Sequence, residues 1–301
     1  MAGRRARWKG LRPLIACSSF AVALGACGRE QSGACSGDDA GDESSLLVKP
    51  ARRSANATAR LAADAAASLF CWSLARPRGD ERDLLELQYR EGASIFACDE
   101  FAFYSSSETN ITGQGGSIVQ AVVVPHNMSC KLGNFQAANN TRIFLKVWKK
   151  LIDDGRYRFH AWTVKSDPDA VFFPARLRMI VSKTEDPQAG NGVFLNNCYH
   201  GLHGPLEVLS RRSMELYAVR GMETCPFEQV EDFYLYRCLL KLGAKQVDAF
   251  DILSERNCET EGWELCGDHH AAFHPFKKEE PWAQCLQRAR EFDGNRALRH
   301  G

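Results

Sequence analysis

Two aspartates separated by a proline stand between two apolar runs, at 161–164 and 170–173. In an extended segment, residues two apart point to the same side, so Asp167 and Asp169 can present both carboxylates to one point, while Pro168 fixes its own φ. Carboxylates this close repel one another when they are desolvated, so they need a positive partner. A hard divalent cation such as Mn²⁺ or Mg²⁺, shared with substrate phosphates, is one such partner. The alternative is a turn in which Asp169 only caps the following helix.

A second candidate metal site lies nearer the C-terminus. Cys266, His269, His270 and His274 form the pattern C-x2-H-H-x3-H, which could ligate zinc. The spacing matches no standard zinc finger or HExxH site, and the cysteines of this chain are better explained as disulfides. A zinc hydrolase that uses these histidines is kept as an alternative function.

Four motifs follow one another along the chain: Lys165-Ser-Asp-Pro-Asp169, the glycine-led segment 204–210, Glu231-Asp232 before a helix with Cys238, and a late His274. In order and approximate spacing they resemble the inverting β-1,3-glycosyltransferases typified by fringe and the core-1 galactosyltransferase. The resemblance covers roughly residues 69–277. It implies a GT-A-like nucleotide-sugar-binding domain, with Mn²⁺ (or Mg²⁺) as cofactor and a UDP-sugar as donor substrate.

The resemblance also implies roles on the donor side. Asp167 and Asp169 would hold the metal ion against the diphosphate of the nucleotide sugar, and His274 would add a nitrogen ligand. Lys165 belongs to the same motif, and Asp99 follows an expected strand. Both would contact the nucleotide sugar.

On the acceptor side, the resemblance assigns the chemistry to the second pair of acids. Asp232 would take the proton from the acceptor hydroxyl, and Glu231 would orient the helix or the acceptor. A carboxylate needs only hydrogen-bond reach to act as a base, and the N-terminus of a helix favours its anionic form. Without the resemblance, both residues are ordinary acids of a first helical turn.

Three positions depart from the pattern of the family. Ser166 replaces an acid, Tyr236 stands where a glycine is usual, and the segment 206–208 lacks an aromatic residue. The first departure is tolerable because residue 166 is not the main metal ligand, and the last two concern the recognition of the acceptor rather than metal binding. We interpret His200 and His203, beside the glycine-led segment, as solvated loop residues; the alternative is that they line a pocket.

The elements that must position these residues alternate along the chain. Strands are expected at 69–75, 94–98, 158–164, 192–197 and 247–252, and helices at 80–90, 141–153, 174–182, 210–221 and 231–242. This alternation predicts an α/β domain with a mostly parallel central sheet. In such sheets ligands bind at the carboxyl ends of the strands, which is where the aspartate pair is expected.

Composition places the protein in the secretory pathway. Twelve cysteines without a CxxC pair indicate disulfides and an oxidising compartment. Four glycosylation sequons begin at Asn56, Asn110, Asn127 and Asn139. With 38 basic and 37 acidic residues the chain has no basic excess for nucleic acid.

The chain is expected to divide into four parts. Residues 1–28 join a basic segment to a short apolar run and are interpreted as a signal peptide or a single-pass signal anchor. Residues 29–68 form a flexible stem, 69–290 the catalytic domain and 291–301 a C-terminal tail.

The predicted function follows from the resemblance and from this organisation. A hexose or N-acetylhexosamine would be moved from a UDP-sugar to a hydroxyl of a glycan or glycoprotein, with inversion, on the lumenal side of the Golgi or ER. A non-catalytic, secreted, disulfide-rich carbohydrate-binding protein of the same fold is the alternative.

Overall fold

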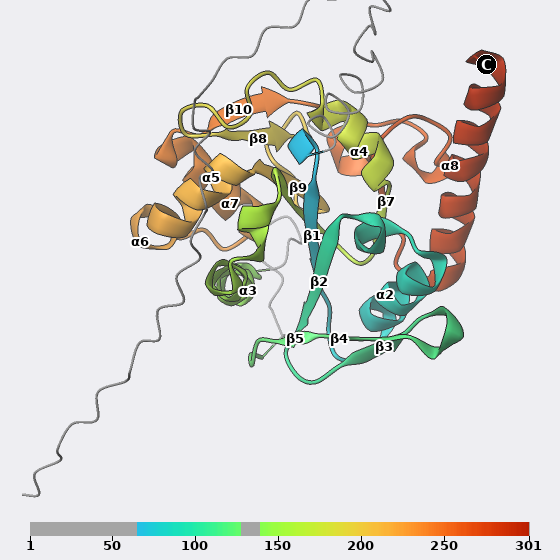
Figure 1. Cartoon of the computed structure of the whole chain (residues 1–301), viewed down its shortest axis with the longest axis horizontal. Coiled ribbons are helices and arrows are strands. Elements are labelled where there is room, and N and C mark those ends of the chain that lie inside the picture. The colour runs from blue at the N-terminus through green and yellow to red at the C-terminus, as the bar shows by residue number, and fades with distance from the viewer. Residues whose placement is uncertain (1–64, 128–138, 301) are drawn as a thin grey trace, which may run out of the picture. The chain divides into compact units, whose positions relative to one another are not determined.

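The computed structural model describes residues 65–127 and 139–300, and its centre is a seven-stranded sheet (Figure 1). The strands are β1 (Leu69–Leu74), β2 (Glu100–Ser105), β5 (Val122–Val123), β6 (Trp162–Ser166), β8 (Val193–Asn196), β9 (Leu206–Ser210) and β10 (Lys245–Asp248). Their order is β10-β8-β9-β6-β1-β2-β5. Within this sheet β9 runs antiparallel to both β6 and β8, and the other neighbours are parallel. The predicted α/β class with a mostly parallel sheet is confirmed.

Helices cover both faces of this sheet (Figure 1). They are α2 (Asp80–Glu91), α3 (Thr141–Asp154), α4 (Pro174–Val181), α5 (Arg211–Leu216) and α7 (Glu231–Leu242). The short helix α6 (Met222–Thr224) has no buried residue. Alternate side chains of a strand point to opposite faces. Phe70 and Trp72 of β1 therefore pack with α3 and α7, whereas Leu69 and Cys71 pack with α2 and α4.

A three-stranded sheet brings a late part of the chain to the aspartate turn. It consists of β11 (Leu253–Glu255), β12 (Ala272–His274) and β7 (Val171–Phe172), in that order. Because β12 pairs antiparallel with β7, the strand that follows the aspartates, its last residue His274 comes beside them. A separate hairpin joins β3 (Asn110–Thr112) to β4 (Ile118–Gln120).

The last helix, α8 (Glu279–His300), packs against the segment that follows the aspartate turn. Its Trp282 donates a hydrogen bond from Nε1 to the carbonyl of Ala170, at 3.0 Å. An ion pair of 3.1 Å between Arg90 and Glu279 connects it to α2, beside which it lies in Figure 1. Residues 291–300, which we expected to belong to a C-terminal tail, continue this helix.

Signals in the sequence explain where the helices end. α3 stops at Gly155 and α7 at Gly243, and both glycines have a left-handed backbone, with φ of 69° and 82°. Glycine adopts this conformation without a steric penalty, so it ends helices readily. α4 begins at Pro174, whose fixed φ suits a first helical position.

Three predicted strands are wrong or displaced. The strand predicted at 158–164 begins late, because Arg156–Phe159 is a 3-10 helix and β6 spans Trp162–Ser166. Ser94–Ala97 is a short 3-10 helix rather than a strand, and β2 begins only at Glu100. Periodicity cannot separate strand from helix in so short an apolar run. The strand predicted at 247–252 is also displaced, because β10 ends at Asp248 and β11 begins at Leu253.

Eight cysteines of the described residues form four disulfides, and such bonds persist in oxidising surroundings. The pairs are Cys71–Cys98, Cys198–Cys258, Cys225–Cys238 and Cys266–Cys285. Cys130 lies outside the described residues.

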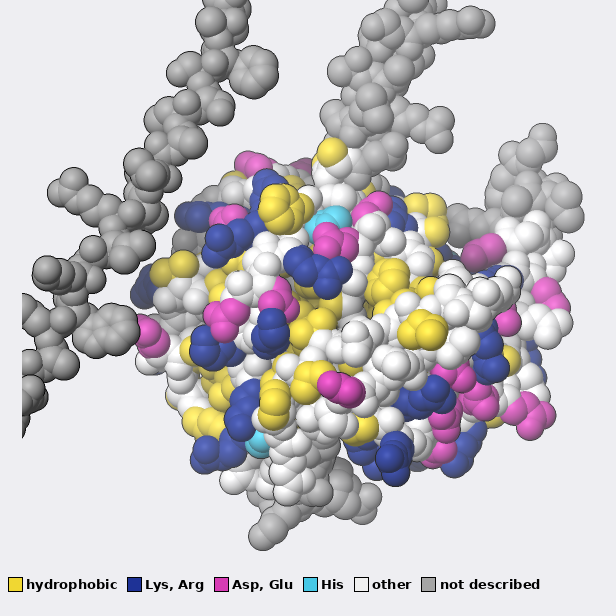
Figure 2. Space-filling model, turned by 60° about the horizontal axis from the view of Figure 1, so that its bottom comes forward, with side chains coloured by type: hydrophobic (Ala, Val, Ile, Leu, Met, Phe, Trp, Pro, Cys, Tyr) yellow, Lys and Arg dark blue, Asp and Glu magenta, His cyan; other side chains and the backbone are white. Residues whose placement is uncertain are grey.

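Most of the leader and stem predicted at 1–68 also lies outside the described residues. In the part of the chain that the structure describes, no helix has both the length and the apolar character to cross a membrane. Basic and acidic side chains are interspersed on the face shown in Figure 2.

Candidate active site

The turn that carries Asp167 and Asp169 follows directly on the buried strand β6 and is held by its backbone. The amide of Asp167 donates to the carbonyl of Pro205 at 3.1 Å. From α2, the buried amide side chain of Gln88 donates to the carbonyl of Pro168 at 2.6 Å. These contacts come from distant parts of the chain, so they fix both carboxylates at the carboxyl end of β6.

Asp167, Asp169 and His274 come together at this turn. Nε2 of His274 lies 3.3 Å from Oδ1 of Asp169, and one ligand atom from each of the three residues lies within 4.8 Å of the other two. Two carboxylates suit Mn²⁺ or Mg²⁺, and the imidazole nitrogen favours the transition metal. Three protein ligands also leave positions for substrate oxygens. The residues present therefore fit the expected cation.

The surrounding charges shift the pKa values of Asp167 and Asp169 in opposite directions. Burial raises the pKa of both carboxyl groups. At Asp169 the nearby His274 and Lys277 outweigh burial, and the pKa falls below its ordinary value. At Asp167 burial and the charge of Asp169 outweigh the effect of Lys165, and the pKa is raised. The two carboxyl groups therefore differ in pKa, and a bound cation would favour the charged form of both.

Behind the turn, the buried Lys165 lies among three carboxylates. Its Nζ is 3.0 Å from Glu231, 3.3 Å from Glu207 and 3.4 Å from Asp167, and it donates to the carbonyl of Gly204 at 2.9 Å. Burial lowers the pKa of this ammonium group, but the carboxylates raise it more, so Lys165 stays charged. The structure therefore places Lys165 where it supports Asp167 from inside the protein.

Glu231 is buried as well and anchors the start of α7. Its Oε1 accepts a hydrogen bond from Nε1 of Trp148 in α3, at 2.9 Å, while its Oε2 faces Lys165. The amide of Glu231 donates to Oδ1 of Asn140 at 3.1 Å. These contacts fix the first turn of α7 and so the position of Asp232.

Asp232 contacts the loop between β8 and β9. Its Oδ2 accepts a hydrogen bond from the amide of Gly204 at 3.1 Å, and Nδ1 of His203 lies 3.2 Å from the same oxygen. Burial raises the pKa of Asp232, but His203 lowers it more, so the net pKa lies below its ordinary value. Burial lowers the pKa of His203, but Asp232 and Glu255 raise it to about 9. At neutral pH the pair is an anion beside a cation.

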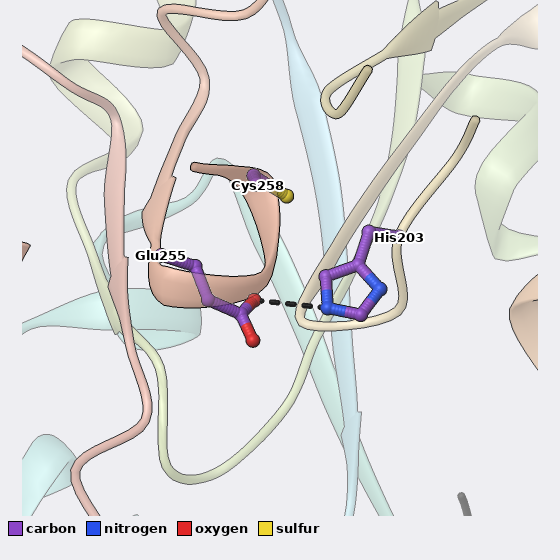
Figure 3. Close-up of side chains that lie close together, drawn as sticks. All are labelled: His203, Glu255 and Cys258. Atoms are coloured by element: carbon purple, nitrogen blue, oxygen red, sulfur yellow. Dashed lines mark ion pairs between the residues drawn. The ribbon is translucent and has the colours of Figure 1, made fainter. Parts of the chain in front are cut away.

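Glu255, the last residue of β11, joins the two halves of the site. Its Oε2 lies 3.0 Å from Nε2 of His203 and 3.2 Å from Nδ1 of His274. Figure 3 shows its carboxylate directed at the His203 ring. Burial raises the pKa of Glu255, but the two imidazoles lower it to about 2. A continuous series of ion pairs therefore runs from Asp232 to the aspartate turn.

A cavity of about 390 Å³ opens at the metal-ligand set. Its lining includes Asp167, Asp169 and His274, the cationic side chains of Arg76 and Lys277, and the apolar side chains of Leu74, Leu84, Ile143 and Phe144. The cationic side chains next to the metal ligands suit the oxygens of a diphosphate, and the apolar wall suits the flat ring of a nucleobase.

A second cavity of about 1160 Å³ opens at the other end of the series of ion pairs. Asp232 and His203 line it, together with Phe227 and Phe233. Both rings are half exposed, at 49% each. An aromatic face beside a carboxylate is an arrangement that can hold a sugar ring next to a base.

Asp99 is not brought to the site. Its Oδ2 accepts a hydrogen bond from the amide of Leu69 at 2.8 Å and lies 2.8 Å from Nη2 of Arg178. Because β1, β2 and β6 are parallel and Leu69 pairs with Trp162 at the start of β6, Asp99 lies at the amino edge of the sheet. Asp167 follows the carboxyl end of β6. We expected Asp99 to follow a strand, but it precedes one.

The zinc set predicted near the C-terminus is not assembled. Cys266 is bonded to Cys285 and cannot act as a thiolate ligand. Nδ1 of His270 lies 2.6 Å from Asp268, and His274 turns instead to the aspartate turn.

A further group of ligand type consists of His203, Glu255 and Cys258 (Figure 3). Cys258 forms a disulfide with Cys198. This group therefore offers two ligands rather than three.

Sequence reasoning missed three residues of the site. His203 was interpreted as solvated, yet it pairs with two carboxylates. Glu207 is buried opposite Lys165 in the pairing of β6 with β9. Glu255 stands opposite His274 in the pairing of β11 with β12. An acid at the end of an apolar run was the one signal for Glu255, and it belongs to no motif.

Comparisons with known proteins add little to this geometry. No protein-family model matches the sequence, and no curated protein matches it. Among solved structures, the chain is similar to the crystal structure of a glycosyltransferase involved in the glycosylation of the major capsid of PBCV-1. The TM-score is 0.39 and the identity 11%, over 75% of this chain and 99% of that one. A likeness of this size gives no information on the chemistry of the site.

Proposed function

We propose that this chain is a metal-dependent glycosyltransferase. It moves a hexose or N-acetylhexosamine from a UDP-sugar to a hydroxyl of a glycan, with inversion. The observation that carries the proposal is the convergence of Asp167, Asp169 and His274 in one cavity, connected by ion pairs to a second cavity lined by Asp232.

The first cavity supplies the groups that a nucleotide-sugar donor requires. Asp167, Asp169 and His274 would hold the cation, and when bound it would act as a Lewis acid toward the diphosphate. Lys277 lines the same cavity, so its ammonium group can face a phosphate oxygen of the donor.

The second cavity supplies the base. The acceptor hydroxyl oxygen attacks the anomeric carbon of the donor, and its proton passes to the carboxylate of Asp232. The bond from that carbon to the phosphate oxygen breaks, and the nucleoside diphosphate leaves with the electron pair. His203 lowers the pKa of Asp232 and so keeps this carboxylate anionic.

Compartment and linkage belong to the same proposal. The four disulfides support an oxidising compartment, and Asn110 of one sequon is exposed in β3. We place the protein on the lumenal side of the Golgi or ER. The β-1,3 linkage rests on the sequence resemblance alone.

Two conservative variants test the proposal. With Mn²⁺ and a panel of UDP-sugars, the unmodified protein should release UDP, and a chelator should stop the release. Asp169→Asn should lose Mn²⁺-dependent donor binding. Asp232→Asn should bind the donor as well as the unmodified protein but transfer slowly. Asp153→Asn, at an exposed position of α3, is the matched control and should change neither.

The outcomes separate the enzyme from its alternative. UDP-sugar binding that needs Mn²⁺ but gives no turnover with any acceptor would identify a carbohydrate-binding protein of the same fold. Retained activity in Asp169→Asn would overturn the metal site.

A further inference from the structure

A single carboxylate oxygen lies between the two histidines of the site. Oε2 of Glu255 is 3.0 Å from Nε2 of His203 and 3.2 Å from Nδ1 of His274. Glu255 is only 2% exposed, so water does not replace these contacts. The other ring nitrogens face outward from this oxygen, Nδ1 of His203 toward Asp232 and Nε2 of His274 toward Asp169. One oxygen thus lies within ion-pair distance of both rings, although neither contact has the angles of a hydrogen bond in this structure.

The surroundings hold Glu255 and the loop of His203 in place from several sides. Nδ2 of Asn257 donates to the second oxygen of Glu255 at 3.0 Å. The side chain of Asn197 accepts a hydrogen bond from the amide of His203 at 2.8 Å and donates to its carbonyl at 2.9 Å. The disulfide Cys198–Cys258 joins the residues next to both asparagines. Figure 3 shows the short turn that carries Glu255 and Cys258 facing His203.

We propose that Glu255 is a positioning residue that aims His274 at the metal ion and His203 at Asp232. It thereby couples the donor half of the site to the acceptor half. This inference rests on the proposed function, because it takes Asp169 and His274 as metal ligands and Asp232 as the base.

General chemistry gives the reason for this role. A histidine that binds a metal through one nitrogen usually donates its other N–H to a carboxylate, which fixes the ring, and loss of that partner costs about 10- to 100-fold in metal affinity or activity. Here the same carboxylate also faces the ring that pairs with the base. A glutamine at position 255 would keep one acceptor oxygen but carry no negative charge, and its NH₂ group would face either the two rings or the donating Nδ2 of Asn257. It would therefore hold the two rings less firmly than the carboxylate does.

The first measurement needs the metal alone. We expect Glu255→Gln to weaken Mn²⁺ binding to the metal-free full chain about 10- to 100-fold, as followed by the paramagnetic resonance signal of free Mn²⁺. His203→Gln should leave Mn²⁺ affinity unchanged, because His203 does not contact the ligand set. Glu261→Gln is the matched control, since it makes the same substitution at an exposed residue nearby.

The second measurement separates coupling from a role at the metal only. At saturating Mn²⁺ the ligand set is filled in every variant, yet kcat of Glu255→Gln should stay low because His203 is still misdirected. His203→Gln should lower kcat with little change in the KM for the donor. The double variant should be no slower than Glu255→Gln by more than about 3-fold, since both changes act on the same contact.

The results decide the proposal in each case. Unchanged Mn²⁺ affinity in Glu255→Gln overturns it, and so does full recovery of kcat at saturating Mn²⁺, because the carboxylate would then serve one histidine alone. Failure of the unmodified chain to bind Mn²⁺ overturns both this inference and the proposed function. Mn²⁺ binding that Glu255→Gln weakens, in a protein without transferase activity, supports the role at His274 and rejects only the proposed function.

Discussion

At the residue scale, Lys165 carries a charge balance on which several other residues depend. Its ammonium group is the cation within 3.4 Å of Glu231, Glu207 and Asp167. Burial raises the pKa of Glu207 well above its ordinary value, and the charge of Glu231 adds to this effect. Buried carboxylates without a cation are costly, so this lysine holds together the strands and the helix that meet behind the site.

Replacing Lys165 should therefore destabilise the fold. We expect Lys165→Met to lower the free energy of unfolding by about 3–5 kcal/mol, because three carboxylates lose their buried partner. Denaturation by urea at neutral pH measures the change. Lys149→Met removes an exposed lysine from an ion pair on α3 and should change the same quantity by less than about 1 kcal/mol. A Lys165→Met protein as stable as the unmodified chain would contradict this assignment.

His203 gives a pH dependence of stability. Its pKa is raised from 6.5 to about 9 in the folded protein. The protonated ring therefore stabilises the folded state fully below pH 6.5, and this stabilisation is lost as the pH rises through about 9. His274 has a pKa raised to about 9 as well, so the unmodified protein alone does not isolate one residue.

A comparison with His203→Gln isolates it. Between pH 6 and 9.5 the unmodified protein should lose more stability than this variant, by roughly 1–3 kcal/mol, because the neutral glutamine has no proton to lose. Urea denaturation at the two pH values provides the measurement. Parallel pH profiles for the two proteins would show that His203 is not charged in the folded state.

The ligand residues could be predicted from sequence, but the residues behind them could not. Asp167 and Asp169 are adjacent enough to form a motif, and the resemblance added His274. Glu255 and His203 are 52 positions apart (255 − 203) and meet only through the packing of β11 against a loop. No local pattern encodes such a contact, because it depends on how separate strands are arranged.

At the element scale, local signals likewise predict an element's limits, whereas its packing partners cannot be predicted from them. The helix predicted at 231–242 has the observed limits of α7, because two acids begin it and Gly243 ends it. β9 was expected only as a glycine-led segment, although all five of its residues are buried. The sequence does not say that Glu207 is buried in it, because the partner that allows this lies on β6. Asp99 was misplaced because a buried 3-10 turn looks like a strand.

One disulfide should matter for activity as well as for stability. The bond Cys198–Cys258 closes a separation of 60 residues and ties the loop of His203 to the turn after Glu255, whereas Cys225–Cys238 closes 13. Removing either pair by alanine should cost about 2–4 kcal/mol of stability, with roughly 1 kcal/mol more for the longer loop. Thermal and urea unfolding would measure this difference.

Transfer rates then distinguish the two double variants. Below its unfolding temperature, the variant without Cys198–Cys258 should show a lower kcat, because Glu255 and His203 are less firmly held. The variant without Cys225–Cys238 should keep the kcat of the unmodified protein. Equal kcat in both variants would mean that the first disulfide only stabilises the fold.

At the scale of the whole molecule, the fold places one cavity at each end of a single series of ion pairs. The cavity of about 390 Å³ adjoins the carboxyl end of β6, and the cavity of about 1160 Å³ adjoins the start of α7. The lining residues of the two cavities do not overlap. Donor and acceptor affinities should therefore be separable by mutation.

Phe233 offers the sharpest test of this separation. Its ring is 49% exposed and lines the larger cavity beside Asp232. We expect Phe233→Ala to raise the KM for the acceptor roughly 3- to 10-fold, the equivalent of losing one aromatic contact. The KM for the donor and the affinity for Mn²⁺ should stay unchanged. Leu240→Ala, at a 43% exposed position of the same helix outside either cavity, is the control. A change in donor KM with Phe233→Ala, or an equal effect of Leu240→Ala, would show that the larger cavity is not the acceptor site.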